Sequence, residues 1–168
     1  MRIRLKPAVD SDIPAILELR AAVAADLTAR FGKGMWSSIG TERGVRFTMT
    51  RATIFVARQR SRVIAMLTLS KRKPWAIDVA YFPPALKPLY LTDMAVAPNR
   101  QRSGIGRRCI EEAIRIARDW PADAIRLDAF ASAAGAGEFY RKCGFREVAR
   151  IRYRGNPLIY LDFAIPPA

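Results

Sequence analysis

The sequence predicts a mixed α/β fold, in which a partly antiparallel sheet carries helices on its faces. Short apolar runs of strand length are interspersed with segments whose apolar residues recur at helical spacing. Two strand-like runs, 53–58 and 63–69, are joined by a tight polar turn, as in an antiparallel hairpin. The second half then has the order strand, helix, strand, helix and two closing strands. This order of elements is typical of a mixed sheet with helices packed on it.

The first fifty residues predict one short strand and two helical segments. Residues 2–6, RIRLK, alternate as a strand does, and the following proline closes it. The DSD segment at 10–12 supplies N-cap residues for a helix whose face-forming residues, Arg20 among them, recur as far as Ala25. A second helical region within 36–50 is interrupted by two glycines.

The rest of the chain alternates strands and helices after one long loop. Residues 71–88 hold four prolines and three aromatic residues, which predicts an irregular loop of the kind that carries specificity. Residues 89–96 form a strand, and 105–117 form an amphipathic helix that Pro121 ends. The remaining predicted elements are a strand at 124–130, a short helix at 137–142 that stops at Gly144, and closing strands at 145–153 and 158–163.

Length and composition limit the classes of protein to which this chain can belong. We expect residues 1–168 to form a single domain, because this length is ordinary for one hydrophobic core and no repeat or linker divides it. The first residues, MRIRLKPAVD, lack the apolar stretch of a signal peptide, and no later run has the length of a membrane span. We therefore expect a cytoplasmic protein without a membrane partner.

Basic residues outnumber acidic ones by 29 to 15 and give a net charge of +14. Such an excess fits a nucleic-acid surface, a site for a polyanionic small ligand, or a solvated basic exterior. The arginines are scattered, apart from Arg58, Arg60 and Arg62 at a turn and the run at 100–108. A nucleic-acid module would gather them on one helix or place them between exposed aromatics, so we expect no nucleic-acid partner.

The chain contains no histidine, which removes the commonest metal ligand and acid-base residue. Cys109 and Cys143 form neither a metal-binding motif nor a disulfide framework and are interpreted as buried thiols. We expect no metal. Any catalysis must use carboxylates, tyrosine, a thiol or the backbone.

The segment NRQRSGIGRR, residues 99–108, lies between a strand and a helix and predicts an anion site. Glycines let another group approach the main chain closely, and amides at the positive end of a helix attract a phosphate. A P-loop is excluded because GxxxxGK is absent, and a dinucleotide fingerprint is excluded because its third glycine is replaced by Cys109.

The segment QRSGIG, at 101–106, resembles the Q/R-x-x-G-x-G/A signature of the GCN5-related N-acetyltransferases (GNAT). Upstream DMAVAP, at 93–98, and downstream FYRKCGFREV, at 139–148, are similar to the neighbouring family elements. The resemblance is firm over 89–163. It implies a mixed, largely antiparallel sheet of six to seven strands, helices on both faces, and a splay between the fourth and fifth strands.

The resemblance implies acetyl-coenzyme A as co-substrate, with its pantetheine arm on a bulged fourth strand and its pyrophosphate on the glycine turn. The family often has an asparagine after the fifth strand, where this chain has Ala133, so that contact passes to Ser132. The residues implied in coenzyme binding are Met94, Ala95, Val96, Gln101, Arg102, Ser103, Gly104, Ile105, Gly106, Arg107 and Ser132.

The resemblance also implies three catalytic residues. Tyr140 stands where the family keeps a tyrosine that protonates the coenzyme sulfur. Asp93 and Asp128 are alternative candidates for binding or deprotonating the amine; Asp93 is preferred because it interrupts an apolar run, where burial is costly without a purpose. A backbone amide, that of Val96 or Met94, would stabilise the oxyanion.

The sequence thus predicts an N-acetyltransferase that transfers acetyl to a primary amine by direct attack in a ternary complex. The alternative is a non-catalytic basic binding module of the same fold that contacts nucleic acid or an acidic partner. We expect the acceptor, a small molecule or a peptide, to contact residues 31–50 and 74–84. The protein is expected to be a monomer or a homodimer.

Overall fold

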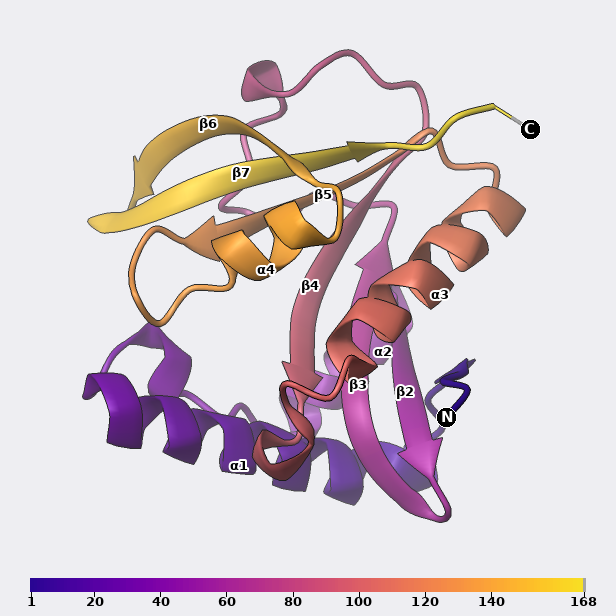
Figure 1. The fold of residues 1–168 in the computed structure, drawn as a ribbon, viewed down its shortest axis with the longest axis vertical. Coiled ribbons are helices and arrows are strands. Elements are labelled where there is room, and N and C mark those ends of the chain that lie inside the picture. Colours follow the sequence, from indigo (N-terminus) through magenta and orange to yellow (C-terminus); the bar gives the residue numbers. More distant parts are fainter. Residues whose placement is uncertain (168) are drawn as a thin grey trace. The chain divides into compact units, whose positions relative to one another are not determined.

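The computed structural model describes residues 1–167 and contains a seven-stranded sheet with the strand order β1-β2-β3-β4-β5-β7-β6 (Figure 1). The strands are β1 (Leu5–Pro7), β2 (Thr53–Gln59), β3 (Arg62–Ser70), β4 (Pro88–Val96), β5 (Ala124–Phe130), β6 (Arg146–Tyr153) and β7 (Asn156–Ala164). The helices are α1 (Ile13–Phe31), α2 (Glu42–Arg51), α3 (Ile105–Asp119) and α4 (Gly137–Lys142). The β4–β5 pair is parallel, and the pairs β1–β2, β2–β3, β5–β7 and β6–β7 are antiparallel. The predicted mixed, largely antiparallel sheet is confirmed.

The chain divides into two compact units, one formed by Met1–Leu69 with Asp93–Ala113 and the other by Ser70–Thr92 with the residues from Ile114 onward. The boundary falls within β4, between Thr92 and Asp93, and within α3, between Ala113 and Ile114. The assignment of residues 1–168 to a single domain stays a prediction.

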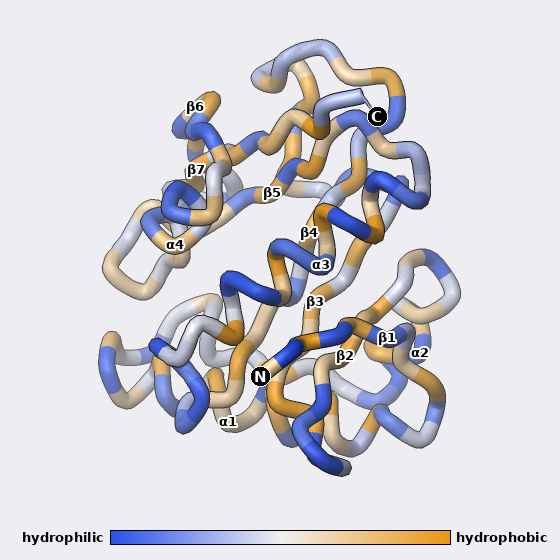
Figure 2. The backbone as a smooth tube through the Cα atoms, turned by 45° about the vertical axis from the view of Figure 1, so that its right-hand side comes forward, coloured by the Kyte–Doolittle hydropathy of each residue, from blue (hydrophilic) through white to orange (hydrophobic). Residues whose placement is uncertain are grey.

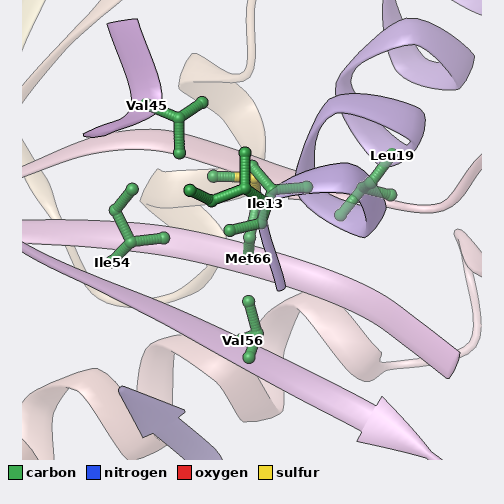
Figure 3. Close-up of a cluster of buried hydrophobic side chains, with 7 residues drawn as sticks. Ile13, Leu19, Val45, Ile54, Val56 and Met66 are labelled. Atoms are coloured by element: carbon green, nitrogen blue, oxygen red, sulfur yellow. The ribbon is translucent and has the colours of Figure 1, made fainter. Parts of the chain in front are cut away.

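In the first unit, α1 and α2 pack on β2 and β3 through a cluster of buried side chains (Figure 3). Burying each such aliphatic side chain stabilises the fold by about 1.5–3 kcal/mol relative to leaving it exposed. This packing fixes where α1 presents its polar residues. The cluster consists of Ile13, Ile16, Leu19, Val45, Ile54, Val56 and Met66.

Two local boundary predictions in this unit are wrong. The first strand is not 2–6: it starts at Leu5 and includes Pro7, which an edge strand tolerates because one side of its backbone needs no ladder hydrogen bond. Helix α1 continues past Ala25 to Phe31, because nothing breaks the helix before Gly32, whose φ is +80°. Asp12 stands at the N-cap position of α1, as predicted, but its side chain makes no cap hydrogen bond, because the carboxylate accepts from the Val9 amide at 2.9 Å and pairs with Arg58.

In the second unit, β5, β7 and β6 form an antiparallel sheet, and the start of β4 runs parallel to β5 over Pro88–Tyr90. Asp128 pairs with Tyr160 across β5 and β7, so their side chains share one face of the sheet. Helix α4 lies on the other face, because a Cβ on its Gly137 would stand 3.1 Å from the Ile159 side chain.

Helix α3 is strongly amphipathic, as the alternation of hydrophilic and hydrophobic colours along it shows (Figure 2). Cys109, Ile110 and Ala113 are buried, whereas Arg107, Arg108 and Glu111 are not. The predicted helix at 105–117 is confirmed and extends to Asp119, just before Pro121.

Candidate active site

Strand β4 contains an irregularity at Asp93, whose φ is +52°. This left-handed conformation is rare for a residue with a side chain, and a single such residue bends a strand and increases its twist as a β-bulge does. Past this point Ala95 and Ala97 pack against the buried cluster of the first unit. The predicted bulge of the fourth strand thus lies at Asp93.

The bulge exposes the Asp93 side chain, which is 48% accessible. The expectation that this carboxylate is buried in an apolar run is therefore wrong. In a regular strand, successive side chains point to opposite faces of the sheet, and the sequence argument relied on this alternation. The left-handed backbone of Asp93 interrupts the alternation, so its side chain follows neither face.

Arg20 of α1 holds the Asp93 carboxylate through an ion pair of 3.1 Å. The Arg20 side chain is only 19% exposed, and a Cβ at Gly40 would stand 3.3 Å from its Nη1 atom. Gly40, with φ of +83°, thus passes close to the guanidinium. The sequence analysis assigned Arg20 no functional role. The signal that could have indicated one is the presence of an arginine on the apolar stripe of α1.

The glycine turn follows β4 through a short 3-10 turn, Pro98–Arg100. Two predicted coenzyme residues use their side chains to stiffen it. Gln101 Nε2 donates to the Val96 carbonyl at 3.0 Å, and Ser103 Oγ donates to the Arg100 carbonyl at 2.5 Å. These two bonds hold the turn in shape through side-chain donors, so they do not use the backbone N–H groups of the turn.

Two residues of the turn, Arg102 and Gly104, have left-handed φ of +58° and +82°. Alternation of left-handed with other conformations directs successive amides toward a common point, an arrangement that binds anions. Within residues 1–167 no protein group accepts from the amides of Arg102, Ser103 or Gly104. The amides that open α3 at Ile105 also lack an intrahelical acceptor by their position. The turn can therefore donate several hydrogen bonds to a phosphate.

The arginines around the turn differ in their availability. Arg107 pairs with Glu111 at 3.3 Å on the exposed face of α3, and Arg108 donates to the Met1 carbonyl. Arg102 has no ion pair among the described residues. Arg102 is thus the side chain best able to add charge to an anion held by the amides.

Tyr140, on α4 in the second unit, is 7% exposed and packs edge-on against Phe139 and Phe145. Burial raises the pKa of Tyr140 well above its usual range, and the negative charge of Asp128 adds to the rise. The phenol therefore keeps its proton at neutral pH. Its hydroxyl has no hydrogen-bond partner within residues 1–167, so it can donate to a ligand.

Asp128 and Ser132 lie on and just after β5 in the same unit. Burial is the larger cause of the raised pKa of both Tyr140 and Tyr160, and the negative charge of Asp128 contributes to each. Ser132 is exposed, and its carbonyl accepts from the Gly135 amide at 2.9 Å. A Cβ at Gly135 would stand 1.8 Å from the Phe130 carbonyl oxygen, so only glycine allows this loop to fold back.

The aromatic loop between β3 and β4 belongs to the second unit and is irregular, as predicted, apart from a 3-10 turn at Val79–Tyr81. The buried Tyr160 holds it: its hydroxyl accepts from the Asp78 amide at 3.1 Å and donates to the Ala76 carbonyl. Trp75, by contrast, is 89% exposed.

Cys109 is poorly suited to covalent catalysis. Burial raises the pKa of the Cys109 thiol to about 12, and the charge of Glu112 contributes. Such a thiol is not a nucleophile at neutral pH. In the part of the chain that the structure describes, no cluster of side chains could hold a metal ion, and no helix is long and apolar enough to cross a membrane.

The structure thus groups the predicted residues by unit. Asp93 and the segment from Met94 to Arg107 belong to the first unit, where Arg20 joins them. Tyr140, Asp128 and Ser132 belong to the second.

Known proteins share this fold. Among solved structures, the ribosomal-protein-S18-alanine N-acetyltransferase of Escherichia coli is 20% identical with a TM-score of 0.74, over 99% of this chain and 96% of that chain. The PaiA N-acetyltransferase of Thermoplasma acidophilum, in complex with coenzyme A, is 15% identical with a TM-score of 0.74, over 98% and 99% of the two chains. YncA of Salmonella typhimurium, with its cofactor acetyl-CoA, is 14% identical with a TM-score of 0.69, over 100% and 96%.

A search of curated protein sequences finds no match. The sequence model of the acetyltransferase (GNAT) family, in contrast, matches residues 22–145. This range includes the end of α1, the bulged strand β4, the glycine turn and Tyr140. With this match over most of its length, and with the same fold as the solved acetyltransferases, the chain belongs to the GNAT family of acetyltransferases.

Proposed function

We propose that the protein is an acetyl-CoA-dependent N-acetyltransferase, which transfers the acetyl group to a primary amine by direct attack in a ternary complex. The observation that carries the proposal is the turn at 101–107, where left-handed Arg102 and Gly104 leave a row of unpaired amides at the start of α3. Two proteins of the same fold contain coenzyme A or acetyl-CoA in their structures.

The residues of the turn fit the coenzyme chemically. The pyrophosphate would accept from the amides of Arg102 to Arg107, with the Arg102 guanidinium adding charge. The two amides of the pantetheine arm would pair with the backbone of Met94, Ala95 and Val96 as an added strand does. Ser132 would supply a further polar contact.

The reaction forms a C–N bond between the amine and the acetyl carbon and breaks the C–S bond of the thioester. The Val96 or Met94 amide would stabilise the oxyanion that develops on the carbonyl. Tyr140 would donate its proton to the departing thiolate. Because burial raises the pKa of Tyr140, the phenol carries its proton at neutral pH.

The amine must lose a proton before or during attack. Arg20 occupies one side of the Asp93 carboxylate, so Asp93 would bind and orient the amine through its other oxygen, and deprotonation would pass to water. Asp128 remains the alternative base. The acceptor would contact residues 31–50 and the loop at 74–84, in which Trp75 is available for packing.

A thiol-release assay with acetyl-CoA and a mixture of primary amines tests the proposal. We expect amine-dependent release of free thiol, and mass spectrometry should find the acetyl group on the amine. If the protein binds acetyl-CoA but releases no thiol with any amine, the non-catalytic binding module is favoured instead.

A further inference from the structure

The buried phenol of Tyr160 joins β7 to the aromatic loop, within the second unit. Its hydroxyl accepts from the Asp78 amide at 3.1 Å and donates to the Ala76 carbonyl. Its ring stacks on Phe82, with 5.1 Å between the ring centroids, and meets Tyr81 edge-on at 6.0 Å. Both main-chain groups and both rings belong to the loop, so this one side chain sets where the loop lies against β7.

The hydroxyl of Tyr160 does more than the ring alone, as a comparison with Tyr90 shows. Tyr90 is also buried in this cluster, but its side chain has no hydrogen-bond partner among residues 1–167. A ring therefore suffices for packing here. The Tyr160 hydroxyl in addition satisfies one donor and one acceptor of the loop backbone, which would otherwise lack partners in the protein. The buried members of the cluster are Ile77, Phe82, Tyr90 and Tyr160.

A pocket of about 380 Å³ lies between the loop and β6, with Tyr160 in its lining. This volume is within the range of small-molecule sites. The pocket presents accessible apolar side chains: Trp75, Val79 and Tyr81 of the loop are exposed, and Tyr153 of β6 is half-buried. The loop thus forms one wall of the pocket and β6 the other, and the position of the first wall depends on Tyr160.

The charged groups of the lining favour a ligand without a second cation. Lys73 and Arg152 line the pocket together with one carboxylate, Asp78. Lys73 and Arg152 each donate to a main-chain carbonyl at 3.0 Å, and the Asp78 carboxylate accepts from a main-chain amide at 3.0 Å. Two cations against one carboxylate repel a polyamine. The exposed aromatic side chains suit a ring, which packs edge-on or offset against them.

We propose that Tyr160 is a positioning residue for the acceptor: it fixes the aromatic loop as one wall of this pocket, and the pocket receives an aromatic group of the primary amine. The inference rests on the acetyl transfer proposed above and names the class of acceptor. Tyr160 acts through the loop and not on the reacting atoms, so its hydroxyl affects how the acceptor binds and leaves the chemical step unchanged.

Steady-state kinetics with acetyl-CoA test this with two amines: 2-phenylethylamine, which carries a ring, and propylamine, which lacks one. We expect kcat/KM to be roughly 10-fold or more higher for 2-phenylethylamine, because its ring leaves water on binding. Tyr160→Phe keeps the ring contacts and removes the two hydrogen bonds to the loop. It should raise the KM for 2-phenylethylamine by roughly 10-fold and leave kcat, coenzyme affinity and the KM for propylamine unchanged.

Tyr90→Phe is the matched control, because it removes a hydroxyl without a hydrogen bond from the same buried cluster. It should change none of these quantities. Trp75→Ala alters an exposed side chain, on which folding does not depend, and should also raise the KM for 2-phenylethylamine alone. When Tyr160→Phe is combined with Trp75→Ala, the two effects should add to less than their sum, since both act on one wall.

The inference is overturned if amines are acetylated without preference for the ring, if Tyr160→Phe raises the KM for both amines alike or lowers kcat, or if Tyr90→Phe has the same effect as Tyr160→Phe. In each of these cases acetylation itself persists. If the protein acetylates no amine at all, the proposed acetyl transfer fails and this inference fails with it.

Discussion

Replacing Gly104 by alanine separates the role of the glycine turn in folding from its role in binding. Gly104 has φ of +82°, and a Cβ there meets no protein atom within 4 Å. The substitution therefore causes no clash, and its cost in stability is the left-handed conformation alone, about 1 kcal/mol. For a chain of this length, that lowers the melting temperature by roughly 2–4 °C.

The open space beside Gly104 is where we place the pyrophosphate, so the same methyl group should lower coenzyme affinity. Displacing the phosphate from its amide donors should weaken acetyl-CoA binding by about 10-fold or more, since each charged hydrogen bond contributes 1.5–3 kcal/mol. Gly104→Leu, with the same backbone cost and more bulk, should weaken it further.

Gly155 provides the matched control. It has φ of +80° at the β6–β7 turn, and a Cβ there also meets no atom within 4 Å. Gly155→Ala should lower the melting temperature by the same amount and leave coenzyme affinity unchanged. Calorimetric titration with acetyl-CoA and thermal denaturation of both variants give the comparison. Equal coenzyme affinity in the two variants would refute the assignment of the turn to the pyrophosphate.

Three predictions concern the chemistry. Tyr140→Phe should reduce turnover by roughly 10²-fold with little change in coenzyme affinity, in steady-state kinetics and titration; turnover at the parent rate would remove Tyr140 from the mechanism. The value of kcat/KM should rise with pH as the acceptor amine loses its proton. Because burial raises the pKa of Tyr140, ionisation of this phenol should cause no decrease in kcat/KM below about pH 10. Asp93→Asn should raise the acceptor KM and move the rise in rate to higher pH, with Asp128→Asn milder; the reverse order would make Asp128 the base.

Most helices and strands could be predicted because their signals are local. The hairpin of β2 and β3, the amphipathic face of α3 and the short helix α4 were read from periodicity and breakers, and the structure confirms them. The errors fall where tertiary contacts decide. Pro7 belongs to β1 because this strand lies at the sheet edge, and edge position is not encoded in the residues around the proline.

The sequence by itself determined the family, the mixed sheet and the place of the glycine turn between a strand and a helix, because these signals act through a few consecutive residues. Only the tertiary structure decided the environment of Asp93. Its left-handed backbone breaks the alternation on which the sequence argument relied, and Arg20, which holds its carboxylate, comes from a helix far away in the chain.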